Sequence, residues 1–335
     1  MKPNIFHYAT SELSQDAILL WLINWAKPEC ETAHKEMHNL GCDFVRLLID
    51  KEIPITSIQT RKQEKDMDIT VDINNSIYLV IEDKVGSGIH GDQLSRYRKI
   101  AHENYGHNRE LCFVYIKTEN ESVAKLREIQ HEEQYRVINR ETIIELLKKY
   151  EESVRTNDIV SDYYDCLLAR QEATDAYMNL PYTEWKVSAW QGFYMELESK
   201  MGEGSWHYVN RIGNVFWGYY FPEIKVCEGS LYLQIEQATF CIKLNVAGDR
   251  STYSRKRDKY RKYIQHCVDD DTPDICNPRK LGCGKDMTLF VIDSLSLYGS
   301  GKVNIDDYIT KIRKYENLLK RVAEYETQEQ SDLIR

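Results

Sequence analysis

The stretch Asp66–Lys84, DMDITVDINNSIYLVIEDK, decides the fold of the first half of this chain. Its residues alternate between apolar and polar in two runs, which is the pattern of β-strands with one face in a core. The segment Asn74–Ser76 lies between the runs, and asparagine tolerates the positive φ that a tight hairpin loop requires. The stretch therefore predicts two antiparallel strands, Asp66–Ile73 and Ile77–Lys84, joined by a three-residue loop.

The register of this hairpin follows from its two faces. Pairing Ile73 with Ile77 sets apolar residues opposite apolar residues, and it sets Asp68 opposite Glu82 on the polar face. A two-residue loop would instead oppose Asp68 with Ile81 and mix the faces, so the pattern favours the three-residue loop. The core face of the first strand is then expected to carry Met67, Ile69, Val71 and Ile73.

The paired carboxylates of Asp68 and Glu82 indicate a metal site. Directly opposed like charges destabilise a strand pair, and a bound cation would remove that cost. One or two carboxylates plus waters are a typical Mg²⁺ ligand set. Lys84 projects from the same face, where it could orient an attacking water or stabilise charge on a phosphate. Asp66 and Asp72 compete as the metal aspartate, but only Asp68 opposes Glu82.

An exposed hairpin with a solvated acidic face is the alternative interpretation of this pattern. Against it, Tyr78–Ile81 is an almost continuous apolar run, which is typical of a central strand covered on both faces. Charged residues at the end of such a strand require partners. The chemistry of the stretch therefore favours a metal site, and the motifs around it add to that interpretation.

Asp68 followed by Glu82–Lys84 resembles the split motif of the PD-(D/E)XK nuclease superfamily. The N-terminal segment TSELSQDAILLWLINWA resembles the opening helix of a bacterial branch of that superfamily, and Glu12 matches the acidic residue that completes its metal site. Gln93 and Tyr97 match the QxxxY motif of RecB-like nucleases, and their spacing places them on one helix face. These motifs occur in the order that the superfamily shows.

The resemblance covers roughly residues 8–140. It implies a restriction-endonuclease-like core, with a mixed central sheet flanked by helices, and metal-dependent hydrolysis of phosphodiester bonds in nucleic acid. By the resemblance, the ligands of Mg²⁺ or Mn²⁺ are Asp68, Glu82, Glu12 and the backbone carbonyl of Asp83. Lys84 would act on the attacking water, while Gln93 and Tyr97 would position the nucleic acid or the lysine.

The chain as a whole predicts two domains, as its 335 residues suggest. The first half has the order α-α-β-β-β-α-β-α-β-α, which is that of a mixed α/β domain. A long helical segment from Asp158 ends before Pro181, because proline disfavours helix in the preceding residue. We therefore expect a nuclease domain over residues 1–180 and an α+β accessory domain with an antiparallel sheet over 181–335. The second domain would bind nucleic acid or a partner, or mediate assembly.

The second half contains one strongly basic segment. Residues 249–265, DRSTYSRKRDKYRKYIQ, hold seven Lys and Arg against two acids, with tyrosines between them. This composition suits phosphate contact and base stacking. It predicts a nucleic-acid contact through Arg255, Lys256, Arg257, Lys259 and Arg261. The alternative is an amphipathic helix whose tyrosines face the core, and the aromatic-rich strands over residues 206–232 leave the same two alternatives, a binding platform or a core.

The overall composition limits the remaining classes. A formal net charge of −9 disfavours a basic coat, so basic contacts should be concentrated. Nine cysteines without a CxxC pair indicate reduced thiols, and no apolar run approaches a membrane span. The candidate zinc ligands His266, Cys267, Cys276 and Cys283 lack tight ligand pairs, and we expect them to be small buried residues near a loop.

These observations together predict a cytoplasmic, Mg²⁺-dependent nuclease that acts on DNA. An RNA-directed nuclease and a non-catalytic binding or assembly module on the same fold remain as alternatives, since fold does not dictate function. No membrane partner is expected, and homo-oligomer formation is left open.

Overall fold

The computed structural model describes residues 2–86, 88, 91–211, 214–293 and 303–334. It divides into two compact units, Met1–Ala173 and Thr174–Arg335. The division expected at Pro181 falls a few residues further along the chain. Within the described ranges, none of the helices combines the length and the apolar character that crossing a bilayer requires.

The first unit has the predicted order of helices and strands. Its main elements are α1 (Glu12–Asn24), α2 (Lys35–Ile49), β1 (Ile58–Glu64), β2 (Met67–Ile73), β3 (Ile77–Lys84), α3 (Gln93–Tyr105), β4 (Glu110–Lys117), α4 (Val123–His131), β5 (Arg136–Asn139), α5 (Arg140–Lys149), α6 (Glu151–Thr156) and α7 (Asp158–Asp175). The strands form a five-stranded sheet in the order β1-β2-β3-β4-β5. The pairs β1–β2 and β2–β3 are antiparallel, whereas β3–β4 and β4–β5 are parallel, so the sheet is mixed.

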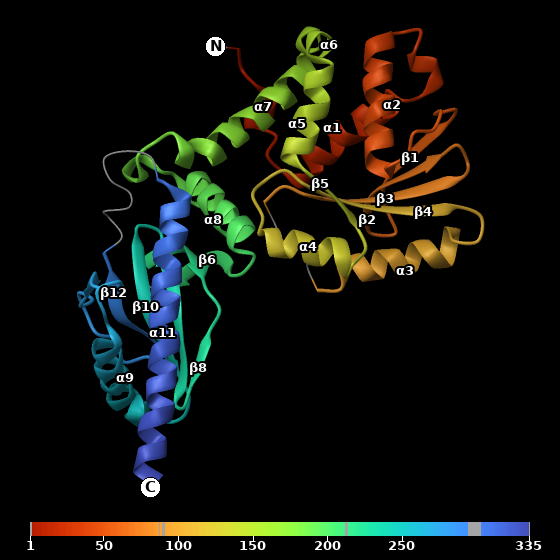
Figure 1. The fold of residues 1–335 in the computed structure, drawn as a ribbon. Helices are drawn as coiled ribbons and strands as arrows, with labels where there is room; N and C mark the ends of the chain where they lie inside the picture. The colour runs from red at the N-terminus through yellow and green to blue at the C-terminus, as the bar shows by residue number, and fades with distance from the viewer. Residues whose placement is uncertain (1, 87, 89–90, 212–213, 294–302, 335) are drawn as a thin grey trace. The chain divides into compact units, whose positions relative to one another are not determined.

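Helices cover both faces of this sheet. Figure 1 shows α1, α2 and α5 on one face and α3 and α4 on the other. Ile69, Val71 and Ile81 belong to the core on the first face, and Tyr78 and Val80 pack on the second. Every residue of β3 is buried, so the apolar run in the sequence indeed marks a central strand.

The central hairpin has the predicted register. Ile73 pairs with Ile77 and Ile69 pairs with Ile81. Asn74 and Asn75 have positive φ values of 55° and 54°, as the loop requires. The ladder of backbone pairs ends at Ile69 and Ile81, so the expected pair of Asp68 and Glu82 lies one step beyond the last paired residues.

Met67 departs from the predicted alternation. It packs with Tyr78 and Val80 on the second face instead of sharing the face of Ile69. The β1–β2 hairpin turns at this point through three residues with positive φ, which are Gln63, Lys65 and Asp66. Strict alternation is lost at this tight turn because the backbone leaves the extended conformation.

The first helix is fixed at both ends. Ser11 caps α1, since its side chain accepts a hydrogen bond from the backbone N–H of Ser14. At the other end, α2 passes so close that a Cβ atom on Gly41 would lie 2.6 Å from the backbone nitrogen of Ala26. This close packing holds α1 against the sheet, with its N-terminal residues beside the end of β3.

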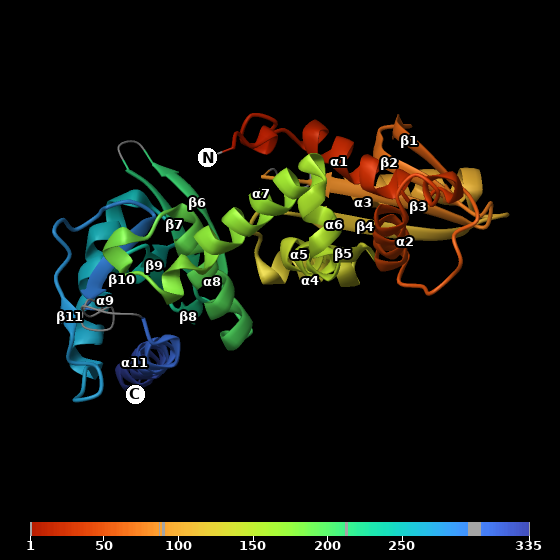
Figure 2. The ribbon, with the colours of Figure 1, turned by 90° about the horizontal axis from the view of Figure 1, so that it is seen from above.

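The second unit is an α+β structure with an antiparallel sheet, as predicted. Its elements are α8 (Val187–Met201), β6 (Ser205–Arg211), β7 (Asn214–Tyr220), β8 (Ile224–Val226), β9 (Gly229–Glu236), β10 (Thr239–Val246), α9 (Tyr253–Cys267), β11 (Ile275–Cys276), β12 (Asp286–Ile292) and α11 (Ile305–Ile334). The strands run in the order β11-β12-β10-β9-β7-β6, with β8 beside β9. Residues of α8, α9 and α11 pack into one core against one face of this sheet, and Figure 2 looks along α11.

Candidate active site

Four of the predicted site residues meet around the ammonium group of Lys84. Its Nζ lies 2.5 Å from Oε1 of Glu82, which precedes it by two residues on β3. Oδ2 of Asp68 on β2 and Oε2 of Glu12 on α1 each lie 3.8 Å from the same nitrogen. Three separate elements of the first unit therefore bring their acidic side chains to one point.

The site has a buried floor and a more open rim. The side chain of Glu82 is fully buried and that of Lys84 is 6% exposed, whereas those of Glu12 and Asp68 are 36% and 26% exposed. Three carboxylates surround one ammonium group, so negative charge is in excess. A cation would reduce this excess, because opposite charges stabilise each other strongly where water is excluded.

The pKa values at the floor reflect this imbalance. Burial and the charge of Asp68 raise the pKa of Glu82 to about 7, although Lys84 opposes the rise. Burial lowers the pKa of Lys84, but Glu82, Asp68 and Glu12 outweigh it and the pKa is raised overall. The two pKa shifts have the same cause, which is the excess of carboxylates in the cluster. Lys84 lies near three carboxylates, whereas Glu82 is balanced by the ammonium group of Lys84.

The backbone between the two motif residues also faces the site. The carbonyl oxygen of Asp83 lies 3.4 Å from Nζ of Lys84, which donates to it. The N–H of Asp83 donates to Oδ2 of Asp68 at 3.3 Å. The carbonyl that the sequence analysis assigned as a ligand therefore lies beside the same ammonium group as the carboxylates.

The side chain of Asp83 points away from the site and links the elements that build it. Its Oδ1 accepts a hydrogen bond of 2.6 Å from Nε2 of Gln15 on α1, and burial raises its pKa well above the ordinary value. Thr118, just after β4, donates to Oε1 of Gln15 at 2.6 Å. This buried chain of hydrogen bonds fixes α1, and with it Glu12, relative to β3.

Gln93 and Tyr97 contact the site through Glu82. Nε2 of Gln93 lies 2.7 Å from Oε1 of Glu82 and 2.9 Å from the hydroxyl oxygen of Tyr97. Tyr97 itself is buried, and burial raises the pKa of its hydroxyl. The two residues share a face of α3, as predicted, and in this structure they orient the glutamate.

The donor set suits a hard divalent cation. Oε2 of Glu82 is buried and has no hydrogen-bond partner, and such an orphaned carboxylate oxygen is costly unless a ligand meets it. Carboxylate and carbonyl oxygens are the ligands that Mg²⁺ prefers. Among the described residues, no three His, Cys, Asp or Glu side chains are arranged closely enough to hold a metal ion. The ammonium group of Lys84 stands between the carboxylates, where it balances part of their charge.

Two residues of the neighbouring strand β4 were missed by the sequence analysis. In the parallel register Tyr115 pairs with Glu82, and Lys117 pairs with Lys84. Both are buried, and the hydroxyl of Tyr115 is among the buried groups without a partner. Burial lowers the pKa of Lys117, while Glu121 at 3.6 Å opposes this. The sequence predicts the strand that ends at Lys117. It does not show which residues of that strand pair with β3, because α3 lies between the two strands in the chain.

The cations assigned to nucleic-acid contact on α9 are mainly held within the second unit. Nζ of Lys259 lies 2.7 Å from Glu326 and 3.3 Å from Glu228. Lys256 donates to the carbonyl of Ala247 at 2.6 Å, and Tyr260 is fully buried. These contacts agree with the amphipathic alternative for the tyrosine.

The remaining cations of α9 show the same tendency, with one exception. Arg257 donates to the carbonyl of Gly282, and Arg261 donates to that of Leu289. The exception is Arg255, whose side chain is 77% exposed and 3.8 Å from Glu228. The assignment of α9 to nucleic acid stays a prediction, and Arg255 is its most accessible residue.

Most of the aromatic candidates in the second unit are buried, and Trp206 and Tyr219 belong to its hydrophobic core. The aromatic residues Trp206, Phe216, Tyr219 and Tyr232 are buried, and Tyr208 is exposed. The prediction that Cys276 and Cys283 are buried is wrong, since both are exposed. Cys276 lies on the two-residue strand β11 at the edge of the sheet, and Cys283 lies in a segment between strands, where no layer covers them.

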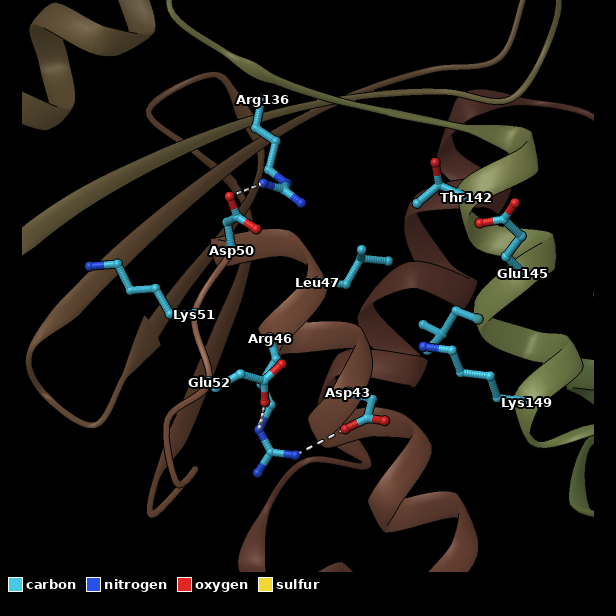
Figure 3. A pocket seen from close by; sticks show the side chains of 11 residues that line it. Asp43, Arg46, Leu47, Asp50, Lys51, Glu52, Arg136, Thr142, Glu145 and Lys149 are labelled. Carbon is cyan, nitrogen blue, oxygen red and sulfur yellow. Dashed lines mark hydrogen bonds and ion pairs between the residues drawn. The ribbon is translucent and has the colours of Figure 1, made fainter.

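A pocket of about 390 Å³ lies elsewhere on the first unit, between α2, β5 and α5 (Figure 3). Its charged residues pair with one another: Arg46 lies 2.9 Å from Asp43, and Arg136 lies 2.5 Å from Asp50. Arg136 begins β5, whereas the candidate active site lies at the carboxyl ends of the parallel strands β3 and β4. This pocket is therefore at the opposite edge of the sheet.

Comparison with known proteins gave one match. A family model described as PD-(D/E)XK nuclease superfamily matches residues 4–165. The comparisons with curated proteins and with solved structures gave no match. The matched range contains every element that contributes to the cluster around Lys84, and it ends within α7.

Proposed function

The first unit of this chain belongs to the PD-(D/E)XK nuclease superfamily, and from this premise we propose that it is a metal-dependent nuclease that hydrolyses phosphodiester bonds. Its mixed sheet with helices on both faces is consistent with a restriction-endonuclease-like fold. The observation that carries the proposal is the convergence of Glu12, Asp68 and Glu82 on Lys84. A sheet that needed only a stable core would not bury an excess of carboxylates there.

The residues divide the work of such a site. A bound divalent cation would supply Lewis acidity and lower the pKa of an attacking water. Asp68, Glu82, Glu12 and the carbonyl of Asp83 are the groups that would hold it. Because the pKa of Lys84 is raised, this residue is cationic at neutral pH. It therefore orients the water by donating a hydrogen bond and stabilises charge on the phosphate.

Positioning falls to residues that hold these groups in place. Gln93 on α3 donates a hydrogen bond to Oε1 of Glu82, and Gln15 on α1 donates one to Oδ1 of Asp83. These two hydrogen bonds hold the neighbouring acidic side chains of β3 in place. Lys117 adds a second cation beside Lys84, suited to another phosphate oxygen. Glu12 and Asp68 are the more exposed members, and the substrate would approach from their side.

We propose DNA as the substrate class, with Mg²⁺ or Mn²⁺ as the metal. The alternatives are an RNA-directed nuclease, and a module that binds nucleic acid without turnover. For the second unit we propose an accessory role in nucleic-acid contact, partner binding or assembly. Loss of DNA affinity in Arg255→Gln would support a role of α9, and unchanged affinity would contradict it.

Cleavage assays on the full chain test the catalytic proposal. Supercoiled plasmid and labelled single-stranded and duplex DNA and RNA are incubated with Mg²⁺, Mn²⁺ or EDTA. We expect cleavage with metal, and at least about a hundredfold loss in Asp68→Asn, Glu82→Gln and Lys84→Met. The matched control is Asp72→Asn on the same strand, because Asp72 pairs with Arg109 at 3.1 Å, away from the cluster.

The outcomes separate the alternatives. Equal activity in the wild type and all three site variants would remove the catalytic assignment. Cleavage of RNA alone would replace DNA as the substrate class. Binding without turnover under every divalent metal would favour the non-catalytic module.

A further inference from the structure

Helix α3 continues away from the candidate active site as a basic helix. Gln93 and Tyr97 lie at the site, and Arg96 lies between them in the chain. The turns beyond Tyr97 carry Arg98, Lys99 and His102. At the rise of an α-helix, His102 lies about 7 Å beyond Tyr97 along the axis. A nucleic-acid strand carries one phosphate charge about every 3.4 Å of duplex axis. A strand that enters the site therefore has further phosphates within reach of these turns.

A pocket of about 350 Å³ opens beside these basic turns, and we name it the α3 pocket. Its lining consists of Arg98, His102, Gly106, Arg109, Leu111, Phe113 and Gln134. The described lining holds two arginines and a histidine but no carboxylate. The pocket shown in Figure 3 differs, because its arginines face paired acids. The α3 pocket therefore has more basic than acidic side chains in its lining.

Arg98 is the cation in this pocket that lacks a charged partner. Its Nη1 donates to the carbonyl of Glu133 at 3.2 Å, and its Nη2 donates to Oε1 of Gln134 at 2.5 Å. Both acceptors are neutral, and no carboxylate of the described residues forms an ion pair with this guanidinium. The ring of Phe113 lies 5.8 Å from it. The positive charge is thus held in place by neutral groups and remains uncompensated.

The guanidinium also has a donor without an acceptor. Nε of Arg98 is buried and makes no hydrogen bond. A role in fastening α3 to the turn at Glu133 and Gln134 explains the two Nη contacts but leaves Nε unexplained. A buried donor without a partner costs about 1–3 kcal/mol, and more on a charged group. A phosphate oxygen is the acceptor that a guanidinium fork fits best.

Arg109 is the second arginine that lines the α3 pocket. Its Nε lies 3.1 Å from Oδ2 of Asp72, so its charge is balanced within the sheet. The lining also includes Leu111 and Phe113 on β4, and this strand ends at Lys117 beside the active site. The α3 pocket and the site therefore share α3 and β4, and one strand of nucleic acid could contact both.

We propose that the α3 pocket binds a backbone phosphate of the nucleic-acid strand that continues from the active site, with Arg98 as its ligand. This proposal rests on the proposed nuclease function and deepens it, because it makes recognition depend on the length of strand beyond the scissile bond. A free phosphate ion or mononucleotide offers the same chemistry. The continuity of α3 and β4 with the site favours the strand.

The test is binding of oligonucleotides to the full chain in EDTA, where metal-dependent cleavage cannot occur. Fluorescein-labelled single strands of two and twelve nucleotides are titrated at several salt concentrations, against wild type, Arg98→Gln and Arg98→Lys. Lys148→Gln is the control, because this exposed lysine lies on α5, on the other face of the sheet. Thermal melting verifies that each variant is folded.

We expect Arg98→Gln to weaken binding of the twelve-nucleotide strand about tenfold, because one charged hydrogen-bonded contact is lost. The slope of log affinity against log salt should fall by about 0.7, the value for one phosphate contact on a single strand. Arg98→Lys should lie between, and Lys148→Gln should match the wild type. Binding of the two-nucleotide strand, whose single internucleotide phosphate cannot occupy the site and the pocket together, should not change. A purely structural role for Arg98 would not create this dependence on length.

Several results would overturn the proposal. One is an Arg98→Gln variant whose affinity and salt slope equal those of the wild type, when the wild type itself cleaves DNA with Mg²⁺. Another is displacement of the long strand by millimolar inorganic phosphate or mononucleotide in the wild type but not in Arg98→Gln, which would make the pocket a site for free anions. A wild type that neither binds nor cleaves any strand would instead refute the proposed function itself.

Discussion

Replacing Glu82 by glutamine should stabilise the metal-free protein and abolish its stabilisation by Mg²⁺. The carboxylate is fully buried, and burial together with Asp68 raises its pKa from 4.5 to about 7. Glutamine imitates the protonated acid in shape and charge. The variant therefore removes the cost of ionising this group, and at the same time it removes the charged oxygen on which a metal ion would rely.

The sign and size follow from linkage between protonation and folding. The native state holds the proton of Glu82 more tightly than the unfolded chain, so wild-type stability falls as pH rises from about 4.5 to about 7. Each pKa unit corresponds to 1.36 kcal/mol, so the loss amounts to about 3 kcal/mol above neutral pH. Glu82→Gln should match the wild type near pH 4.5. At pH 8 it should melt roughly 6–12 °C higher in EDTA, at about 2–4 °C per kcal/mol.

Differential scanning calorimetry of the full chain from pH 4.5 to 8.5, with EDTA or with 10 mM Mg²⁺, provides the assay. A cation bound with a Kd a hundredfold below its concentration adds about 2.7 kcal/mol, so Mg²⁺ should recover most of the loss in the wild type. The variant should not respond to Mg²⁺. A variant less stable than the wild type at pH 8 in EDTA, or equal Mg²⁺ stabilisation of both proteins, would refute the reasoning.

Substitutions at three further residues have outcomes that the contacts define. Lys117→Met should lower kcat/KM for DNA at least about tenfold while the melting temperature stays within a few degrees, because a buried cation beside Lys84 is replaced by an apolar side chain; a variant with wild-type kinetics would exclude Lys117 from the site. Asp83→Asn should change the free energy of unfolding by under about 1 kcal/mol, because its amide oxygen can still accept the hydrogen bond from Gln15, whereas Asp83→Leu should cost about 1–3 kcal/mol by leaving Gln15 without its acceptor; urea unfolding of both variants distinguishes them, and equal losses would contradict a role for this hydrogen bond. Gly41→Ala should destabilise the first unit by about 2 kcal/mol, because its Cβ would meet the backbone of Ala26 at 2.6 Å; an unchanged melting temperature would show that α2 can shift.

The second unit shows what the amino-acid composition predicts and what it does not. The basic segment was correctly placed on a helix, and α9 indeed spans Tyr253–Cys267. Composition could not tell which partners its cations have, because Glu326 and Glu228 are distant in sequence and reach Lys259 only when α11 and β9 pack beside α9. In the first unit, no sequence pattern distinguishes Arg98 from the other arginines. Its place in a pocket that Arg109 also lines follows from the packing of α3 against β4.

The sequence by itself determined the central hairpin, its register and the side of it that carries Asp68, Glu82 and Lys84, because these depend on local alternation and on a turn that asparagine permits. It also determined the order of elements in the first unit. The resemblance to the nuclease superfamily pointed to Glu12 and Gln93, but only the tertiary structure brings them to that face from α1 and α3 and adds Lys117 from β4. The physical reason is that strand alternation has a range of two residues, whereas these contacts depend on how helices and a parallel strand pack across long loops, which no local pattern specifies.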